Sequence, residues 1–182
     1  MEALRQKGPP DYLVNNAGFS TFGHFEELPI DSQRDMVSLH IDATITLCSA
    51  AVPFMRERGG GHIINVSSVG AFLPGKGSAV YGATKAFLNF YSQALQAELS
   101  GSGIEVQALC PGYIRTDFHQ GMDELGFDRS RIPAEMWLDP PAVVAASLAA
   151  LGSGQVLVVP GSGNLELARG GTRSQLELLG AR

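Results

Sequence analysis

Three polar residues near the middle of the chain have side chains that could carry out acid–base chemistry together. Tyr81 and Lys85 are four residues apart in a segment with helical periodicity, so their side chains should lie on one face of a helix, one turn apart. A nearby ammonium favours the phenolate and lowers the pKa of a tyrosine, which makes such a pair a workable general acid and base. Ser68 stands thirteen residues before Tyr81, just past a predicted strand, where its hydroxyl could hydrogen-bond a substrate oxygen that gains negative charge.

Each of these residues also has a simpler explanation. A tyrosine–lysine pair at helical spacing is most often part of a solvated helix face. A Ser-Ser pair after a strand, such as Ser67-Ser68, is most often part of a turn. Residue types and spacing alone therefore do not single out Ser68, Tyr81 and Lys85.

Short β-rich runs alternate with long helical patterns along the chain, and these elements would position the three residues. Strands are expected at residues 11–16, 62–67, 105–110 and 156–159, and helices at about 31–58, 78–99, 140–151 and the C-terminal end. Asp31 is a plausible N-cap of the first helix, and Gly59 to Gly61 end it. Alternation of this kind predicts βαβ units, and hence an α/β fold with a doubly wound parallel sheet. Ligands bind at the carboxyl ends of such strands, and Ser68 follows one of them.

Composition and charge exclude several classes of protein. The formal net charge is -5 and no cluster of lysines and arginines stands out, which argues against nucleic-acid binding. Cys48 and Cys110 lie in apolar runs without a CxxC or Cys/His cluster, so we expect two small core residues in a reducing compartment and no metal site. The chain opens without an apolar signal segment, and its longest nearly apolar stretches fall short of the roughly 20 residues of a membrane span. We expect a cytoplasmic protein with no membrane span.

Four short motifs, taken in order, strongly resemble those of the short-chain dehydrogenases/reductases. The resemblance covers nearly the whole chain, and the motifs are Asn15-Asn-Ala-Gly18, Asn65-Val-Ser-Ser68, Tyr81-Gly-Ala-Thr-Lys85 and Pro111-Gly-Tyr-Ile-Arg-Thr116. The resemblance implies a Rossmann-like fold and an NAD(P)-dependent oxidoreductase, which transfers a hydride between the nicotinamide and a carbonyl or alcohol carbon. The implied cofactor is NADP or NAD, and the resemblance alone slightly favours NADP.

The same resemblance assigns a role to each matching residue. Tyr81 matches the general acid/base, and Lys85 matches the residue that lowers the tyrosine pKa and hydrogen-bonds the nicotinamide ribose. Ser68 matches the hydroxyl that orients and polarises the substrate carbonyl, and the interval of thirteen residues favours it over Ser67. The cofactor-lining positions of the family fall in two loops, at Asn15, Ala17 and Gly18 and at Pro111, Gly112 and Thr116.

The sequence departs from the family in two places. His40 stands at or next to the position of a family asparagine that helps a proton relay. The favoured interpretation of His40 is a core or interface residue, and the other is that it carries a proton in a surviving relay. The family's opening strand and Gly-rich phosphate loop have no counterpart before Asn15, so residues 1–182 are expected to form a single partial domain. The strand around Tyr12 to Val14 would then be an apolar sheet edge that invites association.

Three explanations of the second departure stay open. The chain is a fragment or incomplete gene model of a full-length reductase, a short form whose edge is covered by a partner or by itself, or a degenerate protein that has lost catalysis. The intact catalytic residues favour the first explanation. The alternative to an oxidoreductase is accordingly a non-catalytic binding or scaffolding protein.

Residues 114–138 are expected to form the family's variable substrate lid, a mobile loop with short helical pieces. Its apolar side chains indicate an apolar or amphipathic carbonyl or alcohol substrate, or else only pack the lid on its own domain: Phe118, Met122, Leu125, Phe127, Met136 and Trp137. Apolar residues cover more than one face of the helix at 78–99, and family members commonly form dimers or tetramers through this helix and the helix at 31–58. A homo-oligomer is therefore expected.

Overall fold

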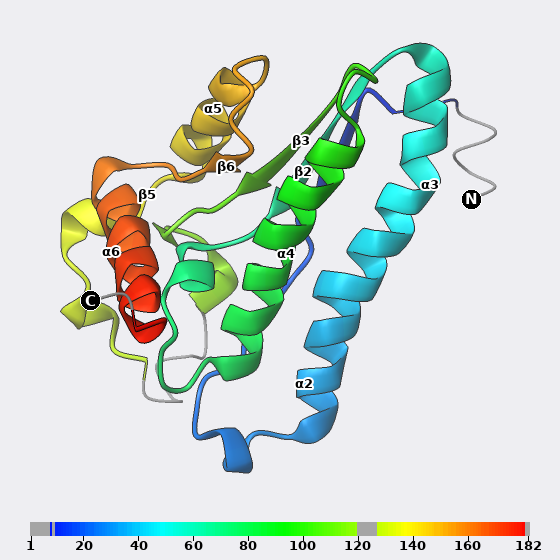
Figure 1. Ribbon diagram of the computed structural model, residues 1–182. Helices are drawn as coiled ribbons and strands as arrows, with labels where there is room; N and C mark the ends of the chain where they lie inside the picture. Colours follow the sequence, from blue (N-terminus) through cyan, green and yellow to red (C-terminus); the bar gives the residue numbers. More distant parts are fainter. Residues whose placement is uncertain (1–7, 9, 120–126, 181–182) are drawn as a thin grey trace.

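In the computed structural model, which describes residues 8, 10–119 and 127–180, a parallel β-sheet is flanked by helices (Figure 1). Its strands are β1 (Tyr12–Asn15), β2 (Gly61–Val66), β3 (Ile104–Leu109) and β6 (Leu157–Val158). They lie in the order β1-β2-β3-β6, and every neighbouring pair is parallel. Parallel neighbours need crossover connections, and here these connections contain the helices. The parallel α/β sheet that the sequence predicts is confirmed.

The predicted helix at 31–58 is a continuous helical run with one wider turn inside it. Helix α2 (Ile30–Val37) leads into a π-helical turn, η2 (Ser38–Asp42), and then into α3 (Ala43–Arg58). The predicted N-cap was wrong: Pro29 occupies that position and Asp31 lies in the first turn, where the helix dipole still stabilises a carboxylate. Gly59 ends the run as predicted, with a φ of 86° that glycine adopts without strain.

The other long helices begin and end close to their predicted bounds. They are α4 (Ala79–Glu98), α5 (Pro140–Ala150) and α6 (Ser162–Leu178). In Figure 1, α3 and α4 lie in front of the sheet, whereas α5 and α6 lie toward the side of β6.

The two faces of the sheet are covered unequally. On one face, α3 and α4 pack on the strands around a buried cluster that includes Met55 and Ile63. On the other face, Val143 of α5 packs in a second cluster with Ile64, which points the opposite way from its neighbour Ile63 because side chains alternate along a strand. Val14 stands in register with Ile64 on this second face and is 53% exposed. Part of this second face is therefore exposed at β1.

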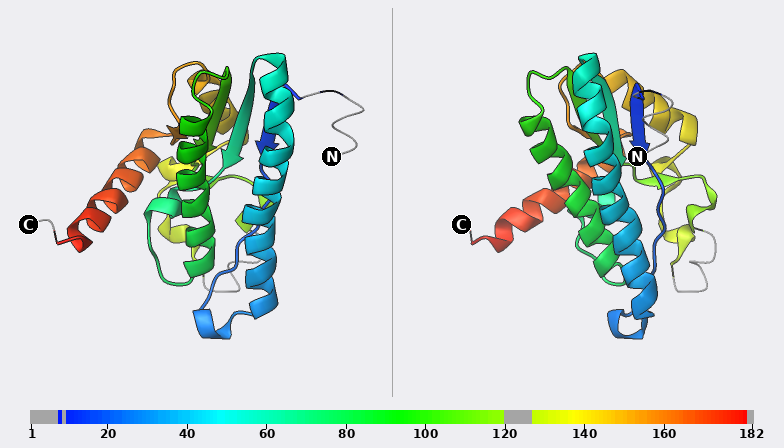
Figure 2. Two further views of the ribbon diagram at one scale, coloured as in Figure 1. Left: turned by 45° about the vertical axis from the view of Figure 1, so that its right-hand side comes forward. Right: turned by 90° about the vertical axis from the view of Figure 1, so that its right-hand side faces the viewer.

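Strand β1 forms an edge of the sheet. Within the described ranges it pairs with β2 alone, and the right-hand view of Figure 2 shows it with no neighbour on its outer side. Tyr12 is 49% exposed, although its ring stacks on His62 of β2 at a centroid distance of 4.8 Å. The predicted apolar edge is thus seen in the structure.

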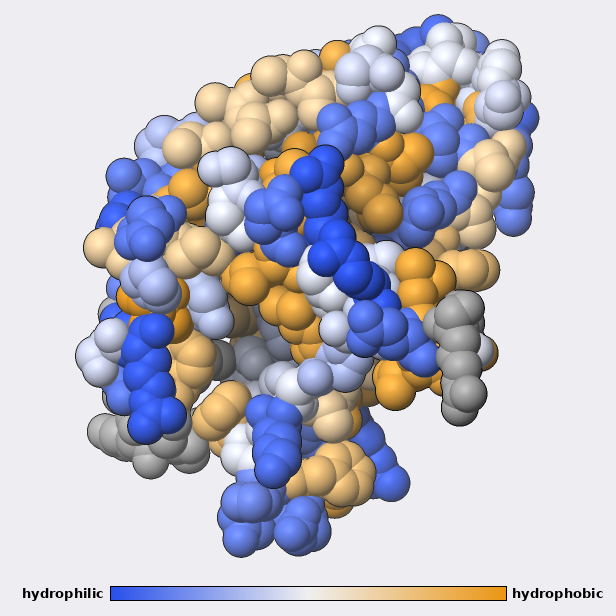
Figure 3. All heavy atoms as spheres, turned by 60° about the vertical axis from the view of Figure 1, so that its left-hand side comes forward, coloured by the Kyte–Doolittle hydropathy of each residue, from blue (hydrophilic) through white to orange (hydrophobic). Residues whose placement is uncertain are grey.

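Apolar surface is not confined to this edge. On the face shown in Figure 3, hydrophobic residues gather near the middle on both sides of a row of hydrophilic residues. Exposed apolar side chains also occur on α5, where Val144 is 54% and Leu148 51% exposed. Surfaces of this kind often contact other molecules.

The predicted lid contains more regular structure than a loop. Strand β4 (Tyr113–Ile114) pairs in parallel with β5 (Trp137–Leu138), and between them lie the single turns η4 (Asp117–His119), η6 (Arg129–Arg131) and η7 (Ala134–Met136). Two of the apolar lid residues named above, Met122 and Leu125, lie outside the described residues.

The cysteines are placed as predicted, since Cys48 and Cys110 are buried free thiols, 1% and 0% exposed. Across the described ranges, no group of three or more His, Cys, Asp or Glu side chains could hold a metal ion.

The expectation that no stretch reaches the length of a membrane span was wrong for one helical run. The run from Ile30 to Arg58 is long and apolar enough to cross a membrane by length and composition. The core helix of a soluble protein passes the same test, and α3 contributes Ala51 and Met55 to the buried cluster on the sheet.

Candidate active site

The carboxyl ends of β2 and β3 hold the loop that carries Ser68. The Ser67 amide donates to the Leu109 carbonyl at 2.7 Å, and the Val69 amide donates to the Pro111 carbonyl at 2.9 Å. These two bonds continue the parallel pairing past the strand ends. Ser68 is therefore fixed between two loops at the ligand-binding edge of the sheet.

The two adjacent serines serve different purposes. The Ser67 hydroxyl is buried and donates to the Lys85 carbonyl at 2.9 Å. Ser68 is half-buried, its hydroxyl accepts from the Gly70 amide at 3.0 Å, and it also hydrogen-bonds the Tyr81 side chain. The structure thus brings Ser68, and not Ser67, together with the Tyr81 hydroxyl.

Tyr81 lies in the first turn of α4, beside the Ser68 loop. Its ring centroid is 6.0 Å from that of His40 and 6.1 Å from that of Phe118. Burial raises the pKa of Tyr81 above its ordinary value, and the hydrogen bond with Ser68 opposes this to a smaller extent. The lowering of this pKa that we expected from Lys85 is not among the causes of the shift, and the phenol is protonated at neutral pH.

Lys85 lies one turn further along α4 and is 5% exposed. Its Nζ donates to the Val66 carbonyl at 2.9 Å and lies 5.7 Å from the centroid of the Tyr81 ring. Burial lowers the pKa of this amine to about 8, so the charged form predominates only below that pH. An ammonium has three N–H donors. The bond to Val66 leaves donors with which Lys85 can bind a ligand hydroxyl.

The first predicted cofactor loop begins at Asn15, whose side-chain amide belongs to a hydrogen-bond network. The Asn15 side chain donates to Oδ1 of Asn65 at 2.7 Å, and Asn65 donates to the Ser92 hydroxyl of α4 at 2.9 Å. Asn65 and Ser92 are fully buried, so these bonds tie β1, β2 and α4 together at one level. Ala17 is exposed and Gly18 half-buried in the loop beyond.

The second predicted cofactor loop is held from behind by a residue that the sequence analysis missed. Pro111 is buried, Gly112 is half-buried and Thr116 is exposed. Asn164, near the start of α6 and 2% exposed, packs its side-chain amide so tightly on Gly112 that a Cβ there would collide with it. The only signal for Asn164 in the sequence is a polar residue directly after a Gly-rich turn, which does not predict burial.

His40 is 2% exposed and its ring bridges two parts of the site. Nδ1 lies 2.8 Å from the Thr84 hydroxyl, and Nε2 accepts from the Phe19 amide at 3.3 Å. Burial, and secondly the charge of Lys85, lower the pKa of His40 to about 4. The favoured interpretation as a core residue agrees with this burial, but the ring lies against Tyr81 rather than away from the site.

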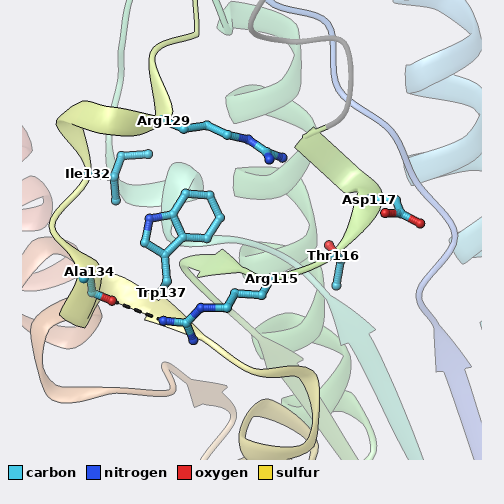
Figure 4. Close-up of a pocket in the computed structure, with 7 residues that line it drawn as sticks. All are labelled: Arg115, Thr116, Asp117, Arg129, Ile132, Ala134 and Trp137. Atoms are coloured by element: carbon cyan, nitrogen blue, oxygen red, sulfur yellow. Dashed lines mark hydrogen bonds between the residues drawn. The ribbon is translucent and has the colours of Figure 1, made fainter.

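A cavity of about 550 Å³ lies beside the second loop (Figure 4). Arg115 donates to the Ala134 carbonyl at 3.4 Å and pairs with Asp139 at 3.0 Å. The Arg129 guanidinium lies 5.8 Å from the centroid of the Trp137 ring. The residues that line the cavity are Arg115, Thr116, Asp117, Arg129, Ile132, Ala134 and Trp137. The lid therefore provides both cationic and aromatic surface next to Thr116.

Comparison with known proteins identifies the family to which the chain is similar. The family model for short chain dehydrogenases matches residues 1–124. Carbonyl reductase family member 4 of Xenopus tropicalis is 31% identical over 170 residues, which cover 91% of this chain and 72% of that protein. The solved structure of a short-chain dehydrogenase from Sphingobium yanoikuyae in complex with NADPH has a TM-score of 0.78 at 32% identity, covering 97% of this chain and 68% of that one.

The match to another relative covers a smaller share of both proteins. An uncharacterized oxidoreductase of Staphylococcus epidermidis is 35% identical over 116 residues, which are 64% of this chain and 50% of that protein. The chain thus matches half the length of this relative. Because the family model covers more than half of the 182 residues, the chain belongs to the short-chain dehydrogenase family.

Proposed function

We propose that this chain is an NAD(P)-dependent oxidoreductase that acts on a carbonyl or alcohol group, with Tyr81 as its general acid/base. The observation that carries the proposal is the meeting of the Ser68 hydroxyl with the Tyr81 hydroxyl at the carboxyl edge of the sheet, one helical turn from Lys85. A proton donor beside a second hydroxyl is the arrangement that reduction of a carbonyl needs, since the oxygen becomes an alkoxide.

Each residue has one task in this mechanism. Ser68 donates a hydrogen bond to the substrate oxygen and holds it beside Tyr81. Tyr81, protonated at neutral pH because burial raises its pKa, gives its proton to that oxygen as negative charge develops. In the oxidation direction the phenolate takes the proton back from the alcohol, and the positive charge of Lys85 stabilises that phenolate.

The donor set at this edge fits the nicotinamide end of NAD(P). Lys85 retains N–H donors for ribose hydroxyls, and the exposed Thr116 offers a hydroxyl for the carboxamide. Asn15, Ala17, Gly18, Pro111 and Gly112 would line the same end of the cofactor. When bound, the cofactor supplies the hydride. NADP is favoured over NAD, supported by the NADPH bound to the Sphingobium yanoikuyae relative.

The proposed substrate is a small carbonyl or alcohol compound with an apolar group. The support is aromatic surface beside the reacting hydroxyl: the Phe118 ring lies against Tyr81, and the Tyr113 and Trp137 rings are 5.4 Å apart on the two short strands of the lid. A cytoplasmic location, expected from composition, belongs to the same proposal.

We also propose a homo-oligomer that forms through α3 and α4. Ile45 and Leu47 on α3 are 40% and 44% exposed, and Phe90 on α4 is 75% exposed. Apolar side chains on two adjacent helices favour a helix-to-helix interface between subunits.

The test of the oxidoreductase proposal is turnover by the purified chain and by two matched variants. NADPH oxidation is followed with a panel of aromatic and aliphatic ketones, and binding of NADPH and NADH is measured by calorimetry. Tyr81→Phe should lower kcat by at least about a hundredfold, because it removes the acid/base and keeps the ring. Tyr91→Phe, ten residues further along the same helix, should leave kcat unchanged. Failure to bind either cofactor, or equal activity of the Tyr81→Phe variant, refutes the proposal.

The exposed edge of β1 favours a second candidate, a non-catalytic binding or scaffolding protein. Val14 and Tyr12 present an apolar strand edge with backbone groups to which another strand can pair. This candidate predicts a stable complex that buries β1 and no turnover. Tyr81-dependent turnover by the purified chain would rule it out in any oligomeric state, and a monodisperse monomer in light scattering would rule out the stable complex.

A further inference from the structure

His40 occupies an unusual backbone position. It lies in the π-helical turn η2, where the Ala43 amide bonds the Ser38 carbonyl five residues back, and it is the buried residue of that turn. A π-turn is wider than an α-turn, and turns of this kind are frequent at functional sites. Here the turn directs an imidazole between the Gly18–Phe19 backbone and the start of α4.

The hydrogen bonds of the ring determine which nitrogen holds the proton. A backbone amide can only donate, so Nε2, which faces the Phe19 amide, must be the acceptor. In a neutral imidazole the proton is then on Nδ1, which donates to the Thr84 hydroxyl. Thr84 in turn donates to the Tyr81 carbonyl at 2.8 Å. Each donor in this chain of hydrogen bonds has an acceptor, and all the bonds point from His40 through Thr84 to the Tyr81 carbonyl.

A charged His40 would break this chain of hydrogen bonds. Protonated Nε2 would face the Phe19 amide, so two N–H donors would point at each other. Among the groups packed around the ring, Lys85 and Tyr81 of α4 are titratable, the segment from Ala17 to Phe19 brings none, and Asp42 of the same turn is exposed. The cation of Lys85 also disfavours a second positive charge here.

We propose that His40 is a positioning residue that, as a neutral imidazole with its proton on Nδ1, fixes the Tyr81 turn of α4 against the Gly18–Phe19 backbone and carries no proton to the substrate. Only the expected effect of His40 on turnover rests on the proposed function of Tyr81. Of the two interpretations that the sequence leaves open for His40, the proposal selects the non-relay one and gives the residue a task in the site.

The same contact explains the glycine at position 18. A Cβ on Gly18 would lie 2.6 Å from Nε2 of His40, closer than such atoms approach in proteins. The loop and the ring therefore fit only as a pair, and the two positions should be energetically coupled.

Two measurements test the proposal without turnover. In nitrogen-15 NMR of the histidine rings of the full chain, His40 should show the Nδ1-protonated neutral form at every pH from 5.5 to 8.5. A titration inside that range, or a proton on Nε2, overturns the proposal. In urea unfolding, Gly18→Ala should lower the midpoint markedly in the wild-type background and much less in His40→Ala. Equal effects in both backgrounds would refute the close fit of loop and ring.

Kinetics separate positioning from proton transfer. His40→Asn should lower kcat about ten- to a hundredfold, because small displacements of a reacting group cost this much, while the pH at half-maximal kcat stays where it is in the wild type. His24→Asn, at an exposed histidine, is the matched control and should behave as the wild type. A shift or loss of one limb of the pH profile in His40→Asn alone would make His40 a proton carrier. If Tyr81→Phe retains full activity, the proposed function fails, whereas the NMR and unfolding results still decide the proposal on His40.

Discussion

A fall in pH should destabilise the folded chain through one buried side chain, His40. The unfolded chain binds a proton at this residue near its ordinary pKa of 6.5, whereas burial and the charge of Lys85 lower the pKa in the folded chain to about 4. Between these two values the unfolded state binds more protons, so the free energy of unfolding falls as the pH falls. From pH 7.5 to pH 5 the expected loss is about 2 kcal/mol, and it approaches about 3 kcal/mol near pH 4.

The assay is urea unfolding of the purified chain at pH 7.5 and pH 5, followed by circular dichroism. His40→Asn removes the titrating group, so this variant should lose about 2 kcal/mol less than the wild type over the same interval, whatever its stability at pH 7.5. His24→Asn should follow the wild type, because His24 is exposed. Parallel losses in the wild type and His40→Asn would show that the imidazole is not held neutral, and the argument from its burial would be wrong.

Further changes in the free energy of unfolding are expected from substitutions on α6, in the asparagine network and at Lys85. Gly170→Ala on α6 should stabilise the chain by about 0.5–1 kcal/mol, since nothing lies within 4 Å of the added Cβ. Gly171→Ala should destabilise the chain, because its Cβ would collide with the Phe72 carbonyl. Thermal unfolding of both variants checks this, and a change of the same sign in both would contradict it. Asn65→Ala should cost about 2 kcal/mol in urea unfolding, because it removes the hydrogen bonds that Asn65 makes with Asn15 of β1 and with the buried Ser92 of α4. A cost near zero would mean that the network does not hold the loop. From about pH 8 toward 10.5, Lys85 is neutral in the folded chain and still charged in the unfolded chain, so its contribution to the free energy of unfolding rises with pH, whereas Cys48 and Cys110, whose pKa burial raises, contribute with the opposite sign. Lys85→Met removes only the first contribution, so the free energy of unfolding of the wild type relative to this variant should rise over the interval, and a constant difference would contradict the lowered pKa of Lys85.

Some parts of the site could be predicted because their signals are local. Four-residue spacing on a helix places Tyr81 and Lys85 one turn apart wherever the helix lies. An apolar run bounded by glycine predicts β2, and a parallel sheet then places Ser68 at its ligand-binding edge. The choice of Ser68 over Ser67 came from motif spacing, and the structure shows the physical difference: the Ser67 hydroxyl is already bonded to the backbone of α4.

Other parts could not be predicted because they depend on contacts between distant segments. Asn164 is far from Gly112 in the sequence, and only the docking of α6 brings its amide onto that glycine. Asp31 has the residue type of an N-cap, but α2 begins at Ile30 and Pro29, two residues earlier, takes the position.

The sequence by itself determined the order of the elements and the parallel sheet, since these follow from periodicity along the chain, and its motifs singled out the side chains at the carboxyl edge of the sheet through their resemblance to a known family. Only the tertiary structure decided the ionisation states of these side chains. The pKa of Tyr81 lies above its ordinary value, that of Lys85 is about 8 and that of His40 about 4, because burial removes water from each group and neighbours far away in the sequence supply the charges and hydrogen bonds that remain. Spacing puts Tyr81 and Lys85 together, and the packing of α4 on the sheet decides how they hold their protons.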